Sequence, residues 1–303
     1  MTKPTVIVAL GGNAILRRGE PLEANIQQQN IAYAAETIAE ISKEYNVVLV
    51  HGNGPQVGLL ALQGLEYKAV DPYPLDVLGS ETQGMIGYML MQALKNLLPN
   101  VHISCMLTQM TVDTNDPAFL DPSKPIGPVY RLQEASELAE KYHWTIKPDG
   151  EYFRRVVPSP LPTGIIEEQA ISALIALDHL VICTGGGGIP VCYQDEKLVG
   201  VEAVIDKDMS AAFLANQLRA DALLILTDAD AVFTDWGKPT QAALRSTTPK
   251  ELAQYQFDAG SMGPKIEASC EFIKQGGRLV GIGALQDGLR ILKGEAGTTI
   301  VAD

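Results

Sequence analysis

The feature that most constrains this chain is an apolar run near its start that stops at two glycines and an asparagine. The run extends from Val6 to Leu10, and Gly11, Gly12 and Asn13 follow it. Five consecutive apolar residues with β-branched members, bounded by glycine, are typical of a short strand buried on both faces, as in a parallel sheet. Glycine lacks a Cβ, so its backbone N–H can approach an anion closely. The run therefore predicts a buried strand that ends in an anion-binding loop.

Two further stretches repeat this design. The apolar residues 47–50 lead into His51, Gly52 and Asn53, and residues 180–184 lead into four glycines at 185–188. In open α/β sheets ligands bind at the carboxyl ends of the strands, so three such ends predict one shared phosphate-binding crevice. A single loop of this kind is a weak signal, because a glycine turn after a strand is more often only a tight connection. Neither Gly-x-Gly-x-x-Gly nor Gly-x-x-x-x-Gly-Lys-Ser/Thr occurs, so a nucleotide would have to be bound by another device.

The spacing of the other apolar residues predicts helices between the strands. Residues 25–44, and a segment that starts near Pro74, carry apolar side chains at helical spacing, and 101–110 is a further strand candidate. This alternation of strands and helices predicts an α/β fold with a parallel sheet covered by helices. Later in the chain we expect helices at 167–178 and from 206 onward, and strands at 223–227, 279–282 and 299–301.

The texture of the sequence changes between residues 117 and 162, where eight of the eighteen prolines are found. Tyrosines, Trp144 and Phe153 are interleaved with them, which favours an inserted subdomain with a small core of its own over a flexible linker. This segment holds Lys124 between Ser123 and Pro125. From the residues alone a solvated surface lysine is the favoured interpretation, because most lysines are exposed.

Composition excludes several classes of protein. The 23 Lys and Arg against 36 Asp and Glu give a net charge of −13, and no basic run is present to hold a nucleic acid. The apolar runs are too short to cross a membrane and the first strand begins too early for a signal peptide, so we expect a cytoplasmic protein. The four cysteines and four histidines lack metal-ligand spacing, and reduced buried thiols are favoured over a disulfide or a zinc site.

The glycines at 185–188 and the start of the following helix both indicate close approach of other groups. Four consecutive glycines lose much conformational entropy on ordering, so a ligand or other backbone is expected to lie against them. The strand-like residues 203–205 meet a helix whose N-cap candidate is Asp206. Acidic residues suit a helix start, which makes a structural role for Asp206 and Asp208 reasonable, but Lys207 is unfavourable there unless an anion is bound.

A second lysine at a helix start is Lys265. Residues 260–263 precede it and would offer free backbone donors to an anion. By contrast, residues 248–251 form a capping box, which marks a helix start without functional content. A hairpin is expected over 191–203.

Glycine-rich strand ends and lysines at helix starts are the parts that phosphoryl transfer requires. That reaction needs two phosphate-bearing ligands held in line and cations that neutralise the charge on the moving group. The sequence shows no nucleophilic Ser/His/Asp order, activated cysteine or metal cluster that would compete with this interpretation. The residues alone therefore favour a phosphotransferase.

A set of motifs, taken together, resembles the carbamate kinases of the amino acid kinase superfamily. The resemblance covers essentially the whole chain, in order, and the proline-rich Ser-Lys-Pro-Ile-Gly-Pro segment sets carbamate kinases apart from acetylglutamate, aspartate and uridylate kinases. The motifs are Gly11-Gly12-Asn13-Ala14, His51 to Gly58, Pro122 to Pro128, Arg154 to Pro160, Gly185 to Pro190, Val204 to Asp208 and Gly260 to Lys265.

The resemblance implies a three-layer α/β/α fold, with a central, mainly parallel sheet between helical layers. It implies one domain over 1–303, with an N-terminal lobe (1–200) on the carbamoyl phosphate side, a nucleotide-binding C-terminal lobe (201–303) and a protruding lid at about 113–162. The implied reaction is reversible transfer of a phosphoryl group between carbamoyl phosphate and ADP, which gives ATP and carbamate, with Mg²⁺ on the nucleotide. Family members are usually homodimers and usually run toward ATP in nitrogen-compound catabolism.

The resemblance also assigns roles to residues, motif by motif. Lys124 would reach in from the lid, against the surface position favoured above. Lys207 and Lys265 would neutralise the in-line transition state, while Asp208 would hold these lysines in position. The phosphoryl and carbamoyl groups would be held by residues of the first two glycine loops, namely Gly11, Gly12, Asn13, Gly52 and Asn53.

The nucleotide would be bound by the C-terminal lobe. Ser261, Met262 and Gly263 would lie along its terminal phosphate, and Asp228 and Trp236 would lie near the rest of it. Family members more often carry Phe or Tyr at the position of Trp236. A stacking role survives that change, but the nucleotide preference could shift.

Alternatives to this function stay open. The loops at Asn13 and Asn53 could admit another small carboxylate in place of carbamate. The chain could instead be a paralogue that binds carbamoyl phosphate or nucleotide as a sensor or partner subunit without turnover. Such a paralogue is expected to have lost a lysine or Asp208, and no such loss is visible. The role of His51 is open as well, since it could simply hydrogen-bond the loop at its strand end.

Overall fold

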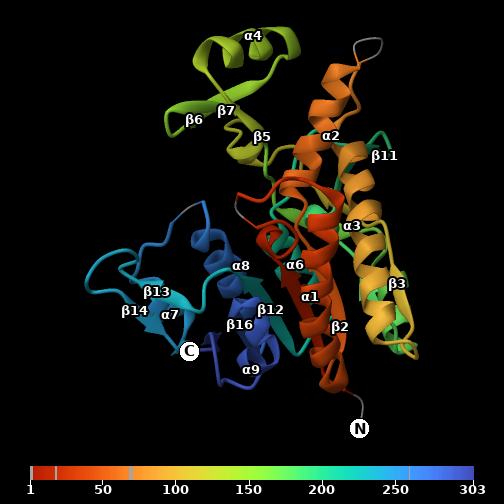
Figure 1. Ribbon diagram of the computed structural model, residues 1–303, viewed down its shortest axis with the longest axis vertical. Helices are drawn as coiled ribbons and strands as arrows, with labels where there is room; N and C mark the ends of the chain where they lie inside the picture. Colours follow the sequence, from red (N-terminus) through yellow and green to blue (C-terminus); the bar gives the residue numbers. More distant parts are fainter. Residues whose placement is uncertain (1–2, 18, 68–70, 259) are drawn as a thin grey trace.

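An eight-stranded sheet occupies the middle of the molecule in the order β15-β17-β16-β12-β1-β2-β9-β3. The computed structural model describes residues 3–17, 19–67, 71–258 and 260–303 (Figure 1). Neighbouring strands are parallel except for β16 and β17, which are antiparallel. The strands of this sheet are β1 (Thr5–Leu10), β2 (Asn46–His51), β3 (Ile103–Cys105), β9 (Leu180–Ile182), β12 (Ala222–Thr227), β15 (Ser246–Thr247), β16 (Leu279–Ala284) and β17 (Thr298–Ile300).

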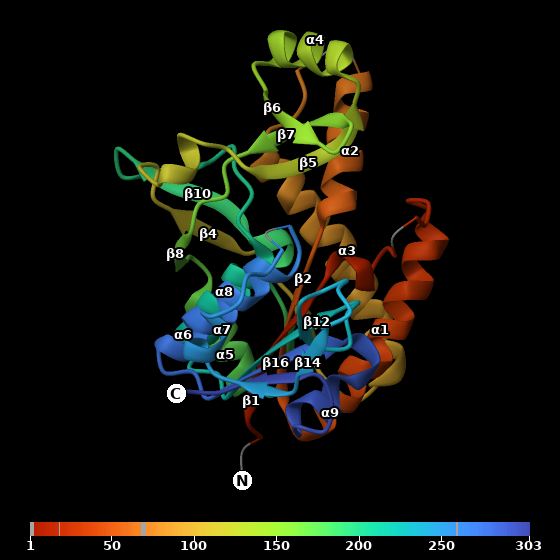
Figure 2. The ribbon, with the colours of Figure 1, turned by 90° about the vertical axis from the view of Figure 1, so that its left-hand side faces the viewer.

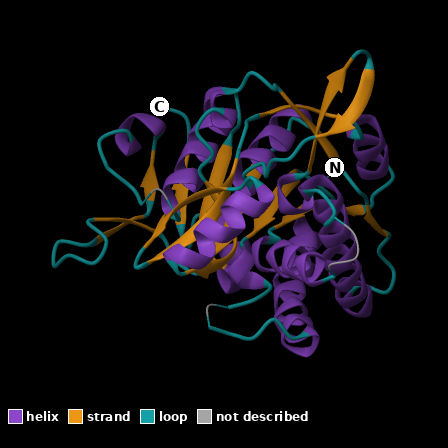
Figure 3. Ribbon diagram, turned by 90° about the horizontal axis from the view of Figure 1, so that it is seen from above, coloured by secondary structure: helices purple, strands orange, loops and turns teal. Residues whose placement is uncertain are grey.

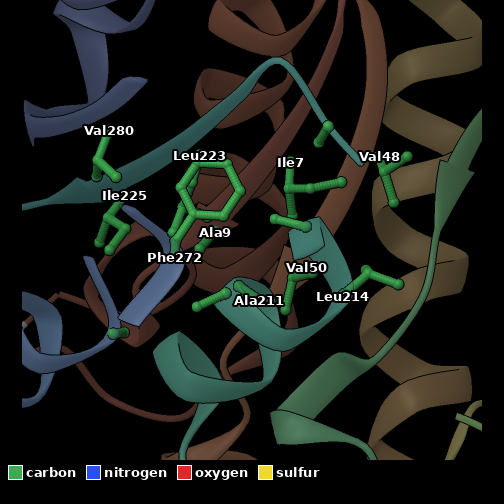
Figure 4. Close-up of a cluster of buried hydrophobic side chains, with 14 of the residues drawn as sticks. Ile7, Ala9, Val48, Val50, Ala211, Leu214, Leu223, Ile225, Phe272 and Val280 are labelled. Carbon is green, nitrogen blue, oxygen red and sulfur yellow. The ribbon is translucent and has the colours of Figure 1, made fainter. Parts of the chain in front are cut away.

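Side chains of the central strands alternate between two apolar cores, one on each face of the sheet. In β1, Val6 and Val8 face the core shared with α1 (Ala24–Glu44), α3 (Leu75–Leu97) and α9 (Gly288–Leu292). Ile7 and Ala9 face the other core, which is shared with α5 (Glu168–Ala176), α6 (Lys207–Gln217), α7 (Pro249–Leu252) and α8 (Met262–Lys274). Figure 4 shows this second core, in which Leu214 of α6 and Phe272 of α8 lie against the strands.

Two helical layers therefore cover the sheet, which confirms the three-layer α/β/α fold. Seen from above, the strands of the large sheet lie among the helices (Figure 3). Both faces being buried explains why the central strands are unbroken apolar runs rather than alternating ones. None of the helices in the described ranges combines the length and apolar character that a membrane crossing needs.

A three-stranded antiparallel sheet protrudes from the body together with one helix (Figure 2). It consists of β5 (Lys124–Tyr130), β7 (Tyr152–Val157) and β6 (Thr145–Asp149), with α4 (Leu132–Tyr142). We call residues 124–157 the lid. The segment in which an inserted subdomain was expected contains these elements. The division of the chain into lobes at residue 200 stays a prediction. Strands β1 and β12, one on each side of that boundary, pair directly.

Helix α2 (Gly54–Glu66) stands beside the lid and carries it (Figures 1 and 2). A Cβ on Gly58 of α2 would lie 3.1 Å from the Cα of Gly127, so the two backbones touch. Ile126 and Val157 of the lid also pack against Val57 and other apolar side chains of the body. The lid is therefore docked on the body by apolar contacts at its base.

A second sheet, in the order β11-β10-β4-β8, lies between the lid and the body. Its strands are β4 (Gln109–Val112), β8 (Pro162–Ile165), β10 (Ile189–Gln194) and β11 (Lys197–Gly200), and a separate hairpin joins β13 (Val232–Thr234) to β14 (Ala242–Leu244). The hairpin expected over 191–203 is confirmed as β10 and β11, which are antiparallel.

Two expectations about strands are wrong. Residues 101–110 form two strands, β3 and β4, that belong to different sheets. Between them the backbone N–H of Thr108 donates to Oε1 of Gln83 (2.8 Å), so a side chain of α3 takes the place of a strand partner. Residues 203–205 join no described ladder. The N–H of Val204 instead donates to the carbonyl of Pro158 (3.0 Å), directly after β7.

Candidate active site

The carboxyl ends of β1, β2, β9 and β12 meet at one edge of the sheet, since these strands are parallel neighbours. The N–H of Gly11 donates to the carbonyl of Leu226 (3.0 Å), and that of Gly52 donates to the carbonyl of Leu10 (3.0 Å). A Cβ on Gly52 would lie 3.1 Å from the backbone nitrogen of Gly12. The structure thus brings the first two glycine loops into direct contact, and a side chain at position 52 would separate them.

The third glycine loop follows β9 and packs on the second. Gly186, Gly187 and Gly188 have φ values of +67°, +96° and +89°, a region that favours glycine. A Cβ on Gly186 would collide with the side chain of Asn53, and one on Gly187 would collide with the carbonyl of Ile205. The close approach expected at these glycines is thus made by the side chain of Asn53 and the backbone of Ile205.

Buried polar side chains of α3 hold these loops, and none of them was predicted from the sequence. Thr82 accepts a hydrogen bond from the amide of Asn53 (2.8 Å). Gln83 donates to the carbonyl of Gly185 (3.0 Å), and Ser210 of α6 donates to that of Gly187 (2.6 Å). Their signal was the pair of polar residues 82–83 on the inner face of an apolar helix, where an unpartnered polar group would be costly.

His51 is buried and has the structural role that the sequence left open. Its Nδ1 lies 3.0 Å from the carbonyl oxygen of Gly52, and its ring lies against Gly185. Burial lowers the pKa of His51 to about 4; the hydrogen bond to Gly52 opposes this shift and the charge of Lys207 reinforces it. The ring is therefore neutral at pH 7, and its Nδ1–H donates to Gly52.

The start of α6 carries the charged centre of the site. Asp206 caps the helix as predicted and accepts hydrogen bonds from the N–H groups of Asp208 (2.9 Å) and Met209 (3.2 Å). Asp208 accepts a hydrogen bond from Lys207 through Oδ1 and one from Lys265 of α8 through Oδ2 (3.0 Å). We call Lys207, Asp208 and Lys265 the lysine cluster.

The lysine cluster is almost completely removed from water. The side chains of Lys207, Asp208 and Lys265 are 12%, 5% and 16% exposed. Burial acts to raise the pKa of Asp208, but the two ammonium groups outweigh it and hold that pKa well below its ordinary value. Burial lowers the pKa of Lys207, and Asp208 opposes the shift. Two lysines against one carboxylate leave a surplus positive charge, which is suited to an anion.

Lys124 reaches from β5 of the lid to the same helix start. Its ammonium nitrogen lies 2.6 Å from Oδ2 of Asp206, and 34% of its side chain is exposed. The interpretation of Lys124 as a solvated surface lysine is therefore wrong. The ion pair joins Lys124 to Asp206, the residue that directly precedes Lys207 of the lysine cluster.

Asn13 and Asp228 join the loops that follow β1 and β12. The amide of Asn13 donates to Oδ2 of Asp228 (2.9 Å), and the hydroxyl of Thr227 donates to Oδ1 (3.1 Å). One residue expected on the carbamoyl phosphate side thus contacts one expected on the nucleotide side.

The start of α8 differs from the expectation of free backbone donors. The N–H groups of Ser261 and Gly263 donate to the carbonyl of Asp258 (3.3 and 2.8 Å), and the N–H of Gly260 donates to its carboxylate (3.0 Å). Asp258 therefore occupies these donors. An aspartate two residues before a glycine is a common turn signal, by which it could have been found.

Trp236 is the predicted site residue that stands apart. It lies on the turn after β13, and 68% of it is exposed. Its ring packs on Phe233 with 5.3 Å between the ring centroids. Within the part of the chain that the structure describes, it takes no part in the loop contacts given above, so its role near a nucleotide stays a prediction.

Comparison with known proteins agrees with this geometry. The model of the amino acid kinase family matches residues 4–283. The carbamate kinase of Rhizobium meliloti is 53% identical over 299 residues, which cover 97% of this chain and 92% of that protein. The carbamate kinase of Escherichia coli strain K12 is 52% identical over 296 residues, which cover 98% of this chain and 99% of that protein. The structure of the carbamate kinase from Giardia lamblia bound to AMP-PNP has a TM-score of 0.93 at 40% identity and covers 99% of both chains. The chain therefore belongs to the amino acid kinase family and, within it, to the carbamate kinases.

Proposed function

We propose that this chain transfers a phosphoryl group reversibly between carbamoyl phosphate and ADP, giving ATP and carbamate. The lysine cluster carries the proposal, because it places a surplus positive charge in a buried position close to three glycine loops. Burying an unbalanced charge is costly unless an opposite charge arrives. The transferring phosphoryl group supplies that charge, which is spread over its equatorial oxygens in the transition state.

The reaction requires positioning rather than proton transfer. Toward ATP, a β-phosphate oxygen of ADP attacks the phosphorus of carbamoyl phosphate. The bond between phosphorus and the carbamoyl oxygen breaks, and carbamate leaves as a carboxylate with the electron pair. No proton moves, so amides, backbone N–H groups and lysines suffice. The neutral ring of His51 is then needed only to hold its loop.

The proposed roles of the side chains follow their places in the fold. Lys207 and Lys265 neutralise the moving group, Asp208 fixes both of them, and Lys124 closes the site from the lid. The donor is held by Gly11, Gly12, Asn13, Gly52 and Asn53, and the nucleotide by Asp228, Trp236, Ser261, Met262 and Gly263.

Mg²⁺ is proposed as a companion of the nucleotide. Mg²⁺ usually keeps several waters and binds through one or two carboxylates together with substrate phosphates. The described residues contain no group of three acidic, His or Cys side chains that could cage a cation, which fits an ion that arrives with the nucleotide. Asp228 is the carboxylate suited to it, because its partners are the neutral Asn13 and Thr227. When bound, Mg²⁺ neutralises charge on the nucleotide phosphates.

We further propose a cytoplasmic homodimer that works in the catabolic, ATP-forming direction. Support for the dimer comes from β3, which ends the large sheet and leaves one edge for pairing. Tyr88 and Met91 of the adjacent α3 line a surface cavity of about 460 Å³ with Ile103, and Tyr88 is 57% exposed. Sedimentation equilibrium tests the dimer, and a charged residue at Tyr88 is expected to give monomers. A monomeric wild-type protein would contradict it.

The function is tested by measuring ATP formed from ADP and carbamoyl phosphate with Mg²⁺. We expect robust turnover by the wild type, almost none by Lys265→Ala, and wild-type turnover by Lys274→Ala, a matched control that removes an exposed lysine from the same helix. Acetyl phosphate and N-acetylglutamyl phosphate serve as competing donors. If one of them is the preferred donor, the substrate is another small carboxylate and not carbamate. Binding of carbamoyl phosphate or ADP without turnover would favour a sensor.

A further inference from the structure

Residues 201–206 connect the lid to the lysine cluster, with a bend at Glu202 where the N–H of Ala203 donates to the carbonyl of Val201 (2.9 Å). We call this segment the connector. Its buried residues Ala203 and Ile205 face the body, and Ile205 belongs to the main core. The residues between them face the lid: Glu202 accepts from Arg155 (2.7 Å), the N–H of Val204 donates to Pro158 (3.0 Å), and Asp206 accepts from Lys124 (2.6 Å). Glu202 and Asp206 are thus bonded to the lid, and Val204 is bonded to Pro158, the residue directly after the lid. Asp206 directly precedes Lys207.

Arg155 is a lid side chain whose orientation is fixed on two sides. Its guanidinium carbon lies 4.6 Å from the ring centroid of Trp144, the residue directly before β6, and its side chain is 15% exposed. Nη2 donates to Oε1 of Glu202. A planar guanidinium that stacks on an aromatic ring and pairs with a carboxylate has little freedom to turn.

Glu202 is tied to the body as well as to the lid. Its second oxygen, Oε2, accepts a hydrogen bond from the N–H of Leu75 (2.8 Å), the first residue of α3. The same helix carries Thr82 and Gln83, which hold the second and third glycine loops. The ion pair between Arg155 and Glu202 therefore joins the lid to the element that shapes the phosphate-binding loops.

We propose that Arg155 and Glu202 are positioning residues, whose ion pair sets the lid so that Lys124 is presented to the phosphate site. Arg155 lies opposite Ile126 in the pairing of β7 with β5, two residues along β5 from Lys124. A shift of β7 relative to the connector therefore moves Lys124. This role rests on the proposed phosphoryl transfer, and neither residue contacts the lysine cluster in the hydrogen bonds of the described chain.

A double-mutant cycle with Lys124 tests whether the ion pair acts through that lysine. Arg155→Met should lower kcat/KM for carbamoyl phosphate about ten-fold, because a displacement of about 1 Å can cost up to about a hundred-fold. In a Lys124→Met background the same change should cost less than about two-fold, since the two residues would act as one unit. Glu202→Gln, which keeps an acceptor for Leu75, should reproduce Arg155→Met, and Arg155→Lys should retain part of the activity.

The matched control is Lys147→Met, which removes an exposed ion pair between the same lid and Asp121 and should leave activity unchanged. Equal losses from Arg155→Met in both backgrounds would reveal general damage to the fold and overturn the proposal. So would wild-type activity of Arg155→Met.

A second measurement reports on the lid without any turnover. Trp144 and Trp236 are the two tryptophans of the chain, so in a Trp236→Phe background the emission comes from Trp144 alone. Glu202→Gln should increase the quenching of Trp144 by acrylamide, because Arg155 is no longer held over its ring. A wild-type chain that makes no ATP would contradict the proposed function instead. Unchanged quenching would then still overturn the ion pair as the contact that fixes the lid.

Discussion

The lysine cluster and the lid lysine differ in how the fold holds them, although both are anchored at the start of α6. Lys207 and Lys265 stand on packed helices and share Asp208, with at most 16% of each side chain exposed. Lys124 stands on a strand of the protruding lid, is 34% exposed and pairs with Asp206. The cluster is therefore fixed before any ligand arrives, whereas the lid lysine depends on where the lid sits.

This difference teaches that preorganisation is divided between two parts of the molecule. A buried, fixed charge acts at full strength because water does not screen it, whereas a partly exposed charge is weakened by water and salt. We expect changes in the cluster to cost more than the matching changes at the lid.

Matched substitutions of the two aspartates give the largest expected contrast. Asp208→Asn leaves two buried ammonium groups without a counter-charge, which should lower kcat by about a thousand-fold and destabilise the fold by about 3 kcal/mol. Asp206→Asn keeps a cap acceptor for α6 and loses only the charge that faces Lys124, so a loss of about ten-fold is expected. ATP formation and urea unfolding measure both, and similar effects at the two positions would break the comparison.

The pH dependence of stability sharpens the comparison through His51, which is buried like the lysine cluster. Its pKa is about 4 in the fold and near 6.5 when unfolded. Between these values the unfolded chain binds more protons, so stability is lost as pH falls from 6.5 toward 4, by roughly 3 kcal/mol. His51→Gln cannot titrate and should lose correspondingly less over this window. Urea midpoints at each pH test this, and parallel curves for the two proteins would contradict the burial of a neutral ring.

Lys124→Ala is the corresponding test on the lid side. We expect kcat/KM for carbamoyl phosphate to fall by about 10- to 100-fold, less than for Lys265→Ala, because the charge is partly exposed. The contribution of Lys124 should also shrink as salt is added, owing to screening, while that of Lys265 should change little. Assays of both variants over a range of salt measure this. An equal salt response of the two lysines would contradict their different exposure.

Two glycines with similar backbone angles provide the smallest test. Gly186 in the third loop and Gly150 in the lid have φ values of +67° and +63°, so alanine should cost about 1 kcal/mol at either position through backbone strain. A Cβ at 186 also meets the side chain of Asn53, whereas one at 150 meets open space. Gly186→Ala should therefore cost about 1 kcal/mol more in urea unfolding and reduce activity. Equal losses of stability at the two positions would indicate that the third loop shifts to admit a Cβ, and would contradict its tight packing on Asn53.

The fold could be predicted where the signals are local. Residues 6–10 form a buried strand because their apolar run requires two covered faces, and Asp206 caps α6 because its side chain bonds the N–H groups beside it. The helix expected at 25–44 is α1, Ala24–Glu44. The break between β3 and β4 could not be predicted, since Gln83, distant in sequence, bonds the backbone of Thr108.

The candidate site shows the same limit. The glycine loops, Lys207 and Lys265 could be found from the residues alone, because glycines after strands and lysines at helix starts are recognisable patterns. Lys124, which lies on a strand, was assigned only through the resemblance to the carbamate kinases. The contacts that hold them could not, because Thr82 and Gln83 reach the loops from another helix. Asp258 carries a turn signal in the sequence, but which donors of α8 it occupies depends on how the chain turns. The roles assigned to these residues in the reaction stay predictions.

The direct pairing of β1 with β12 has a consequence for how substrate preference can change. Asn13 follows one of these strands and Asp228 follows the other, so the expected binding sites for the donor and for the nucleotide lie at the ends of neighbouring strands. Neighbouring strands keep a spacing of about 4.8 Å whatever side chains they carry. The backbone of the sheet, and not the side chains of the loops, then sets the separation of the two substrates. Mutations in the loops can therefore change which small acid is bound without changing the direction of phosphoryl transfer.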